Sequence, residues 1–299
     1  MSRHTRGSLR PAATEFVVVA AVLVVLYLWQ RLLRLASSVA FGSLPVAGGV
    51  SGALFLAGVV AIIGGYARVR HVDCGLRPPT AGDLPWIGVA AGSPLGLVTL
   101  TALVSRATGV RYGSLTGTAV AADPPLVPVV TVAGLGLLVG IPSLVVVCQV
   151  LVQGSFARVV DGDAVVVPTT AVTGFVTVSD TGGLAAIPGL GRLGGVVVFA
   201  VLLGGAALAN ERIDPHRRGL RVLAYLPVAA LVALAVGSGV AGLGSVAAGL
   251  FAATQFVTLG VAAYAYARTG SLLVPAFAYA ALLSANRVVV VAFEAGAGL

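Results

Sequence analysis

Charge is scarce in this chain of 299 residues. It has 18 basic side chains, all of them arginine because lysine is absent, and 10 acidic ones, so only 9% of the residues are charged. An average soluble domain has roughly 25%. Apolar residues make up 58% of the chain, and such a composition cannot cover a water-exposed surface of this size with polar groups. The sequence predicts an integral membrane protein and argues against nucleic-acid binding, in spite of the net charge of +8.

Cysteine and histidine are scarce as well. The two cysteines, Cys74 and Cys148, are too few for a disulfide framework. The three histidines, His4, His71 and His216, lie in predicted loops rather than in apolar runs. A zinc site needs three or four converging Cys, His or carboxylate ligands, and no spacing in this chain supplies them within a predicted span. The phosphate-binding pattern GxxxxGK[ST] is absent too, which argues against an ATP-driven pump.

The apolar runs predict an all-α fold, a polytopic transmembrane helix bundle of about eight or nine spans. A spanning helix needs about 20 apolar residues. The charged residues separate runs at 16–30, 35–67, 84–105, 124–157, 164–179, 193–210, 222–267 and 269–286. The run 222–267 is too long for one helix, and its glycine-rich middle, 237–244, predicts the turn of a hairpin. The run 164–179 is short and contains Pro168, Thr169, Thr170 and Thr173.

Arginine placement predicts a multi-pass protein of the cell membrane with a cytoplasmic N-terminus, because cytoplasmic loops are enriched in basic residues. In this orientation five arginines face outward, namely Arg31, Arg34, Arg106, Arg111 and Arg192. Twelve face the cytoplasm: Arg3, Arg6, Arg10, Arg68, Arg70, Arg77, Arg158, Arg212, Arg217, Arg218, Arg221 and Arg268. Arg287 is the one charge well inside an apolar run, where it either bonds carbonyls or lines a polar site.

Two segments resemble motifs of a known family. The stretch 260–275, with Arg268-Thr-Gly-Ser-Leu272 and Pro275, is similar to the pattern G-Y-x-Y-x-R-T-G-S-L-W-x-P of the CPBP family. These proteins, the CAAX proteases and bacteriocin-processing (Abi) enzymes, are intramembrane metalloproteases. The segment 140–154 resembles the family's first motif helix. The resemblance implies N-terminal transmembrane helices over 1–124 and a CPBP-like core over 125–290, with an inserted helical hairpin at 193–244.

The resemblance also implies where catalytic residues would stand. The family uses a Glu-Glu-x-x-x-Arg helix, a Phe-x-x-x-His helix and a His-x-x-x-Asn/Asp helix around a metal-activated water. The matching positions of this chain hold none of these residues; they are Leu144, Val145, Gln149, Thr173, Thr177, Tyr279 and Leu283. Leucine and valine can neither bind a metal nor transfer a proton. We therefore expect no catalytic residue and no metal ligand in this chain. Zinc, the metal of the family, is predicted to be lost.

The sequence thus predicts a catalytically inactive CPBP-like pseudoprotease that acts as a scaffold or regulator of another membrane protein within the lipid bilayer. Enzymatic activity is not expected. A transporter or lipid-binding protein that uses the vacated cavity is one alternative, and an active CAAX-type peptidase is a second. In place of the metal site the sequence predicts a polar pocket between the motif helices, formed by Gln149, Thr177, Tyr279, Asn286 and Arg287.

Overall fold

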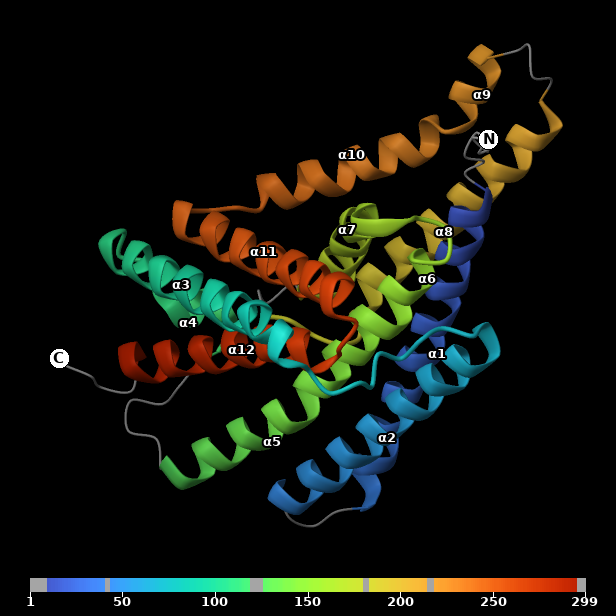
Figure 1. Cartoon of the computed structure of the whole chain (residues 1–299). Coiled ribbons are helices and arrows are strands. Elements are labelled where there is room, and N and C mark those ends of the chain that lie inside the picture. The colour runs from blue at the N-terminus through green and yellow to red at the C-terminus, as the bar shows by residue number, and fades with distance from the viewer. Residues whose placement is uncertain (1–9, 41–43, 119–125, 180–182, 214–217, 295–299) are drawn as a thin grey trace.

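The computed structural model describes residues 10–40, 44–118, 126–179, 183–213 and 218–294, and their regular structure is helical (Figure 1). The long helices are α1 (Arg10–Ala40), α2 (Leu44–Arg70), α3 (Leu84–Ala107), α5 (Leu126–Val145), α8 (Leu190–Arg212), α11 (Val246–Thr269) and α12 (Leu273–Glu294). Shorter elements are η1 (Ala81–Asp83), α4 (Tyr112–Thr116), the π-helical η2 (Val146–Gln153), α6 (Gly154–Phe156), η3 (Gly162–Val165), α7 (Val166–Thr177), α9 (Arg218–Ala224) and α10 (Leu226–Ala241). The prediction of an all-α fold is confirmed.

Seven helices in the described ranges are long and apolar enough to cross a membrane, so the chain is a multi-pass membrane protein. The prediction of about eight or nine spans counted two further apolar runs. The run 164–179 forms α7, which has 12 residues, and the first half of 222–267 forms α10, which has 16. Both helices are shorter than the roughly 20 residues that span a bilayer. Helix α7 ends where the backbone of Val178 becomes extended.

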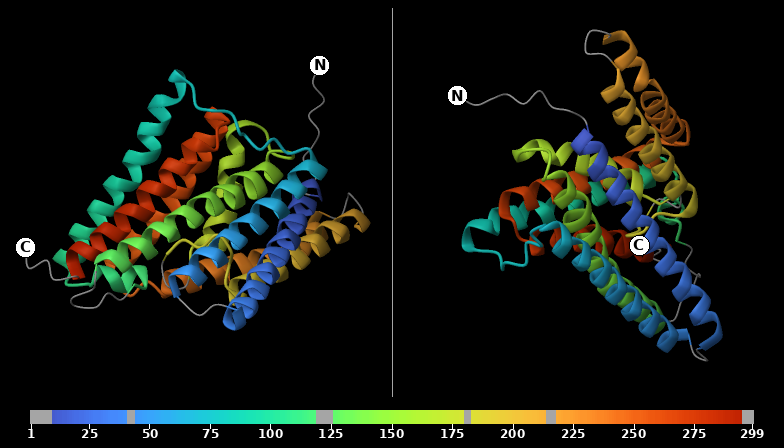
Figure 2. Two further views of the ribbon diagram at one scale, coloured as in Figure 1. Left: turned by 90° about the horizontal axis from the view of Figure 1, so that it is seen from below. Right: turned by 90° about the vertical axis from the view of Figure 1, so that its right-hand side faces the viewer.

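Helix α11 lies at the centre of one half of the bundle, where it packs against α3, α12 and α7 (Figure 1). Helix α5 joins this half to α2, which in turn packs against α1. Helices α8, α9 and α10 lie on one flank beside α1 (Figure 2). This flank contains most of the segment 193–244 that the resemblance treats as an insertion.

Two ends of the bundle differ in their loops and charges. At one end, Glu15 of α1 accepts hydrogen bonds from Arg70 of α2 and lies 3.4 Å from the guanidinium of Arg158. At the same end, Arg268 pairs with Asp163 at 2.7 Å. Helices α1 and α3 carry the chain to the opposite end, where Arg31, Arg34, Arg106 and Arg111 lie. The predicted inside positions Arg3, Arg6 and Arg217 are outside the described residues.

The Arg-Thr-Gly-Ser-Leu segment, which carries the resemblance to the CPBP family, forms the turn between α11 and α12. Gly270 ends α11 in the left-handed conformation with φ of 60°. Ser271 is fully buried, and its hydroxyl donates to the carbonyl of Arg77 at 2.8 Å. The amide of Leu272 donates to the carbonyl of Gly75 at 3.0 Å. The motif therefore holds the loop between α2 and α3 against the start of α12.

Gly75 gives a stability prediction, since its φ is +57° and a Cβ there would lie 2.8 Å from the carbonyl oxygen of Gly270. We expect Gly75→Ala to lose about 1–2 kcal/mol to backbone strain and about 1–3 kcal/mol more to overpacking. Gly109→Ala is the matched control, because φ is +70° but no atom lies within 4 Å of the added Cβ. The free energy of unfolding of both variants can be measured in mixed micelles. Equal losses in Gly75→Ala and Gly109→Ala would contradict the close contact between Gly75 and Gly270.

The two ends of the bundle predict a labelling pattern. In a background of Cys74→Ser and Cys148→Ala, single cysteines at Arg77 and Asp161 should react with a membrane-impermeant maleimide from one side. A cysteine at Ser114, which follows α3, should react only from the other side. The arginine bias predicts that this first side is the cytoplasmic one. Labelling of positions 77 and 161 from opposite sides would contradict this arrangement.

Candidate functional site

Gln149 is the central residue of the candidate site. It lies in η2, a π-helical segment that continues α5, and π-helical turns are frequent at functional sites. Its side chain is fully buried. The phenol oxygen of Tyr279 on α12 lies 3.2 Å from Nε2 of Gln149 and 3.3 Å from Oε1, so the phenol can donate to the amide or accept from it. This neutral pair joins two of the three helices on which the resemblance places metal ligands.

The surroundings of the pair are apolar and close-packed. Leu144 and Val145 are 1% and 5% exposed, and both belong to the buried cluster that contains Tyr279 and Cys148. Leu283 packs against the same cluster and is only partly buried. The side chains of Leu144, Val145 and Leu283 can neither bind a metal nor carry a proton, and Cys148 adds one buried thiol to the cluster.

Threonines of α7 approach this site but use their hydroxyls within their own helix. The hydroxyl of Thr173 donates to the carbonyl of Thr169, and that of Thr177 donates to the carbonyl of Thr173, each at 2.7 Å. Val178, the next residue, packs against the cluster around Tyr279. Helix α7 also packs against η2. The hydroxyl of Thr177 bonds its own helix and not Gln149 or Tyr279, as is common for threonine in helices.

Asn286 and Arg287 form their hydrogen bonds with residues other than Gln149 and Tyr279. The phenol of Tyr112 on α4 donates to Oδ1 of Asn286 at 2.6 Å, and burial raises the pKa of Tyr112, which keeps this donor protonated. The guanidinium of Arg287 donates to the carbonyl of Ala133 on α5. The five residues expected in one polar pocket are thus distributed over four separate hydrogen-bonded groups, and only Gln149 and Tyr279 share one.

Two buried glutamines complete the polar interior, and sequence reasoning did not single them out. Nε2 of Gln153 donates to the carbonyl of Ala263 at 2.8 Å, while its Oε1 has no hydrogen-bond partner among the described residues. Gln255 on α11 is 1% exposed, and neither end of its amide has a partner in the described part of the chain. The available signal was the occurrence of glutamine within apolar runs, where an unpaired amide is costly.

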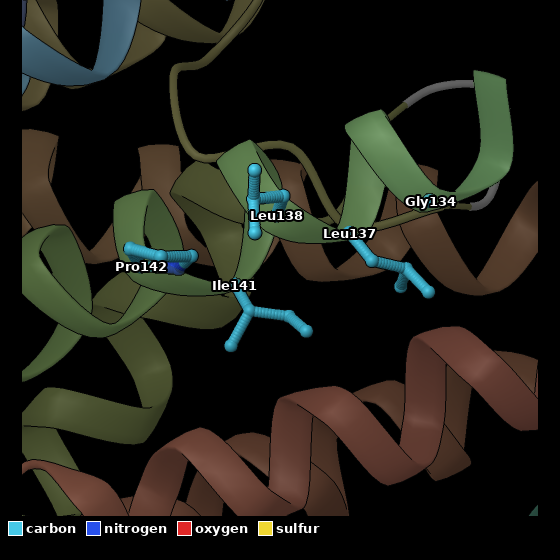
Figure 3. Close-up of a pocket in the computed structure, with 5 residues that line it drawn as sticks. All are labelled: Gly134, Leu137, Leu138, Ile141 and Pro142. Carbon is cyan, nitrogen blue, oxygen red and sulfur yellow. The ribbon is translucent and has the colours of Figure 1, made fainter. Parts of the chain in front are cut away.

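The donor set at the family's metal position does not fit zinc. An amide, a phenol and threonine hydroxyls replace the nitrogen, sulfur and carboxylate ligands that zinc prefers in proteins. Within the described ranges no three His, Cys, Asp or Glu side chains converge. A groove of about 340 Å³ is present on α5, lined by Gly134, Leu137, Leu138, Ile141 and Pro142 (Figure 3), and it does not include Gln149 or Tyr279.

Comparison of the chain with protein-family models, curated proteins and solved structures finds no match.

The pair predicts a measurable coupling between Gln149 and Tyr279. Tyr279→Phe should lower the free energy of unfolding by about 1–3 kcal/mol, because it leaves a buried amide with one partner fewer. Gln149→Leu together with Tyr279→Phe should cost less than the sum of the two single variants, by about 0.6–1.7 kcal/mol, the size of interhelical hydrogen bonds in membranes. The matched control is Thr101→Val, because the hydroxyl of Thr101 bonds the hydroxyl of Thr254 at 3.1 Å. The loss of unfolding free energy in Thr101→Val should add to the loss in Tyr279→Phe. If the losses of Gln149→Leu and Tyr279→Phe were also strictly additive, this would contradict a hydrogen bond between Gln149 and Tyr279.

Proposed function

We propose that the chain is a CPBP-like pseudoprotease of the cell membrane, which acts as a scaffold or regulator of another membrane protein. The observation that carries the proposal is the Gln149–Tyr279 hydrogen bond at the family's metal position. An active enzyme of this type needs a metal-activated water between the motif helices. Here a phenol and an amide bond each other, and the fully buried Tyr279 packs in an apolar cluster.

The retained and lost parts of the family pattern support the same proposal. The Arg-Thr-Gly-Ser-Leu turn has a structural role, because Ser271 and Leu272 bond the loop before α3. At the positions that match the family's catalytic residues, Leu144, Val145 and Leu283 pack in an apolar cluster, and Gln149 bonds Tyr279. A chain that keeps the turn and loses the ligands is expected to keep the fold and lose the peptidase activity.

A scaffold also needs an outer surface that another transmembrane helix can approach. Helix α3 carries Gly88, Gly92 and Gly96 at four-residue spacing; each is exposed, and no atom lies within 4 Å of an added Cβ. Small residues at this spacing allow the backbones of two membrane helices to come close. Val89 and Leu95 flank the stripe and are 49% and 46% exposed. This face of α3 is the surface that we assign to the partner protein.

A photo-cross-linking experiment tests the proposal. A photoreactive amino acid at Val89 should cross-link one defined membrane protein in the source membranes. Gly92→Ile should abolish most of that product, because the branched side chain keeps a partner backbone at a distance. Gly64→Ile is the matched control, since Gly64 is an equally open glycine on α2. It should leave the product unchanged.

Two results would contradict the scaffold role. The first is an equal change in the amount of cross-linked product in the variants Gly92→Ile and Gly64→Ile. The other is hydrolysis of a prenylated CAAX peptide by the purified protein, at a rate that Tyr279→Phe or Gln149→Leu abolishes. That second result would support the alternative of an active peptidase.

A further inference from the structure

Helix α7 ends near the centre of the membrane and not at its surface. It starts at the end of the bundle that carries the Asp163–Arg268 ion pair. The backbone of Gly174 lies against the ring of Phe256, so these two residues are at the same depth. Phe256 is near the middle of α11, whose 24 residues form one of the candidate spans. Helix α7 therefore stops at Thr177, only about 5 Å beyond the level of Gly174.

Helix α8 begins at a similar depth. The guanidinium of Arg192, in its first turn, donates to the carbonyl of Phe175 at 3.2 Å. Farther along α8, Gly204 lies against Val17, which is near the start of α1 and at the same end of the bundle as the ion pair. From Leu190 to Gly204 the helix rises by about 21 Å, which is less than the hydrocarbon thickness of about 30 Å. Helices α7 and α8 thus enter and leave the membrane on the same side.

The connection between the two helices lies inside the membrane. We call its described residues, 178–179 and 183–189, the tip segment. The amide of Ala185 donates to the carbonyl of Thr177 at 2.7 Å, but the amides of Leu184 and Ala186 have no acceptor among the described residues. Both residues are only half-buried. Irregular backbone at this depth is tolerated where protein buries it or where it meets water, and not where it meets lipid.

Gln255 is a second polar group without a partner near the same depth. It is 1% exposed, and neither end of its amide is bonded in the described part of the chain. Thr254, before it on α11, bonds Thr101 of α3, and Phe256, after it, lies against Gly174 of α7. Successive helical residues turn by about 100°. The buried side chain of Gln255 therefore points into the bundle between α3 and α7.

The tip segment reaches the region into which Gln255 points. Phe251 and Leu259 lie one turn to either side of Gln255 and on the same face of α11, and they belong to two different buried clusters. Leu184 of the tip segment packs against both clusters, so it lies where they meet. A primary amide offers two donors and one acceptor oxygen. Water is the smallest molecule that satisfies both kinds of group, and buried waters typically bond about three such groups.

We propose that the tip segment is a re-entrant turn whose exposed face is hydrated, and that Gln255 binds a water molecule at the inner edge of this hydrated region. The water enters from the end opposite to the Asp163–Arg268 pair, because the tip segment lies beyond the level of Phe256 on that side. Neither an acyl chain nor a transmembrane helix offers free hydrogen-bonding groups to the tip amides, since the backbone of a helix is already paired. The site does not depend on the scaffold role.

Cysteine modification in proteoliposomes tests the hydration. In a cysteine-free background, Ala185→Cys should react with a membrane-impermeant methanethiosulfonate from the side that labels a cysteine at Ser114. Ala253→Cys is the matched control, because Ala253 is exposed on α11 three residues before Phe256, where lipid can cover a fully paired helix. Since the thiolate is the reacting species and needs water, position 185 should react at least about tenfold faster. Equal rates at both positions, or modification of position 185 from the other side alone, would overturn the proposal.

Radiolytic labelling with X-rays tests the water at Gln255. A bound water yields hydroxyl radicals that oxidise neighbouring side chains, so Phe251 should be oxidised although it is only 4% exposed. Gln255→Leu should reduce this oxidation to background. Thr258→Val is the matched control and should retain it, because the hydroxyl of Thr258 already bonds the carbonyl of Thr254 at 2.8 Å.

Two results would overturn the water site. One is equal oxidation of Phe251 in the unsubstituted protein and in Gln255→Leu. The other is an unsubstituted protein in which Phe251 is not oxidised, a result that does not depend on how well any variant folds.

Discussion

The absence of water from the bilayer core is the constraint on which this structure depends. Each buried polar group must find its partner within the protein or in bound water, because lipid offers none. Helices satisfy the backbone, and Thr173 and Thr177 satisfy their hydroxyls on carbonyls of the preceding turn. Other buried side chains bond across helices, as Tyr112 does with Asn286 and Thr101 with Thr254. Gln149 finds Tyr279, and Gln153 finds the carbonyl of Ala263, so these bonds determine how η2 sits against α12 and α11.

The same constraint explains where charge is tolerated. The ion pairs of Glu15 with Arg70 and of Asp163 with Arg268 lie at one end of the bundle, where water and headgroups begin. The Arg-Thr-Gly-Ser-Leu turn lies at this end too and bonds the loop between α2 and α3 through Ser271. Arg287 is one exception, and its guanidinium donates to the carbonyl of Ala133 on α5.

The apolar runs and their lengths were sufficient to predict the long helices, because a spanning segment is specified locally by its own residues. The number of spans was predicted less well. Helix α7 ends at Thr177, inside a run whose hydropathy alone does not mark an end. The hydrogen-bond partners of the side chains could not be predicted from the sequence. Asn286 and Arg287 are neighbours in the chain, but they bond Tyr112 and Ala133, which lie on different elements. The amide of Gln255 has no partner among the residues that the structure describes, and the spacing of residues in the sequence did not indicate this.

The central claim is that the family's metal position is closed by a direct bond between neutral side chains. Electron cryo-microscopy of the protein in a lipid nanodisc, at a resolution that separates side chains, tests it most directly. The account predicts continuous packing around Gln149, with its amide about 3.2–3.3 Å from the phenol oxygen of Tyr279 and no density between them. Separated side chains around a cavity that holds density for a metal, water or substrate would contradict it.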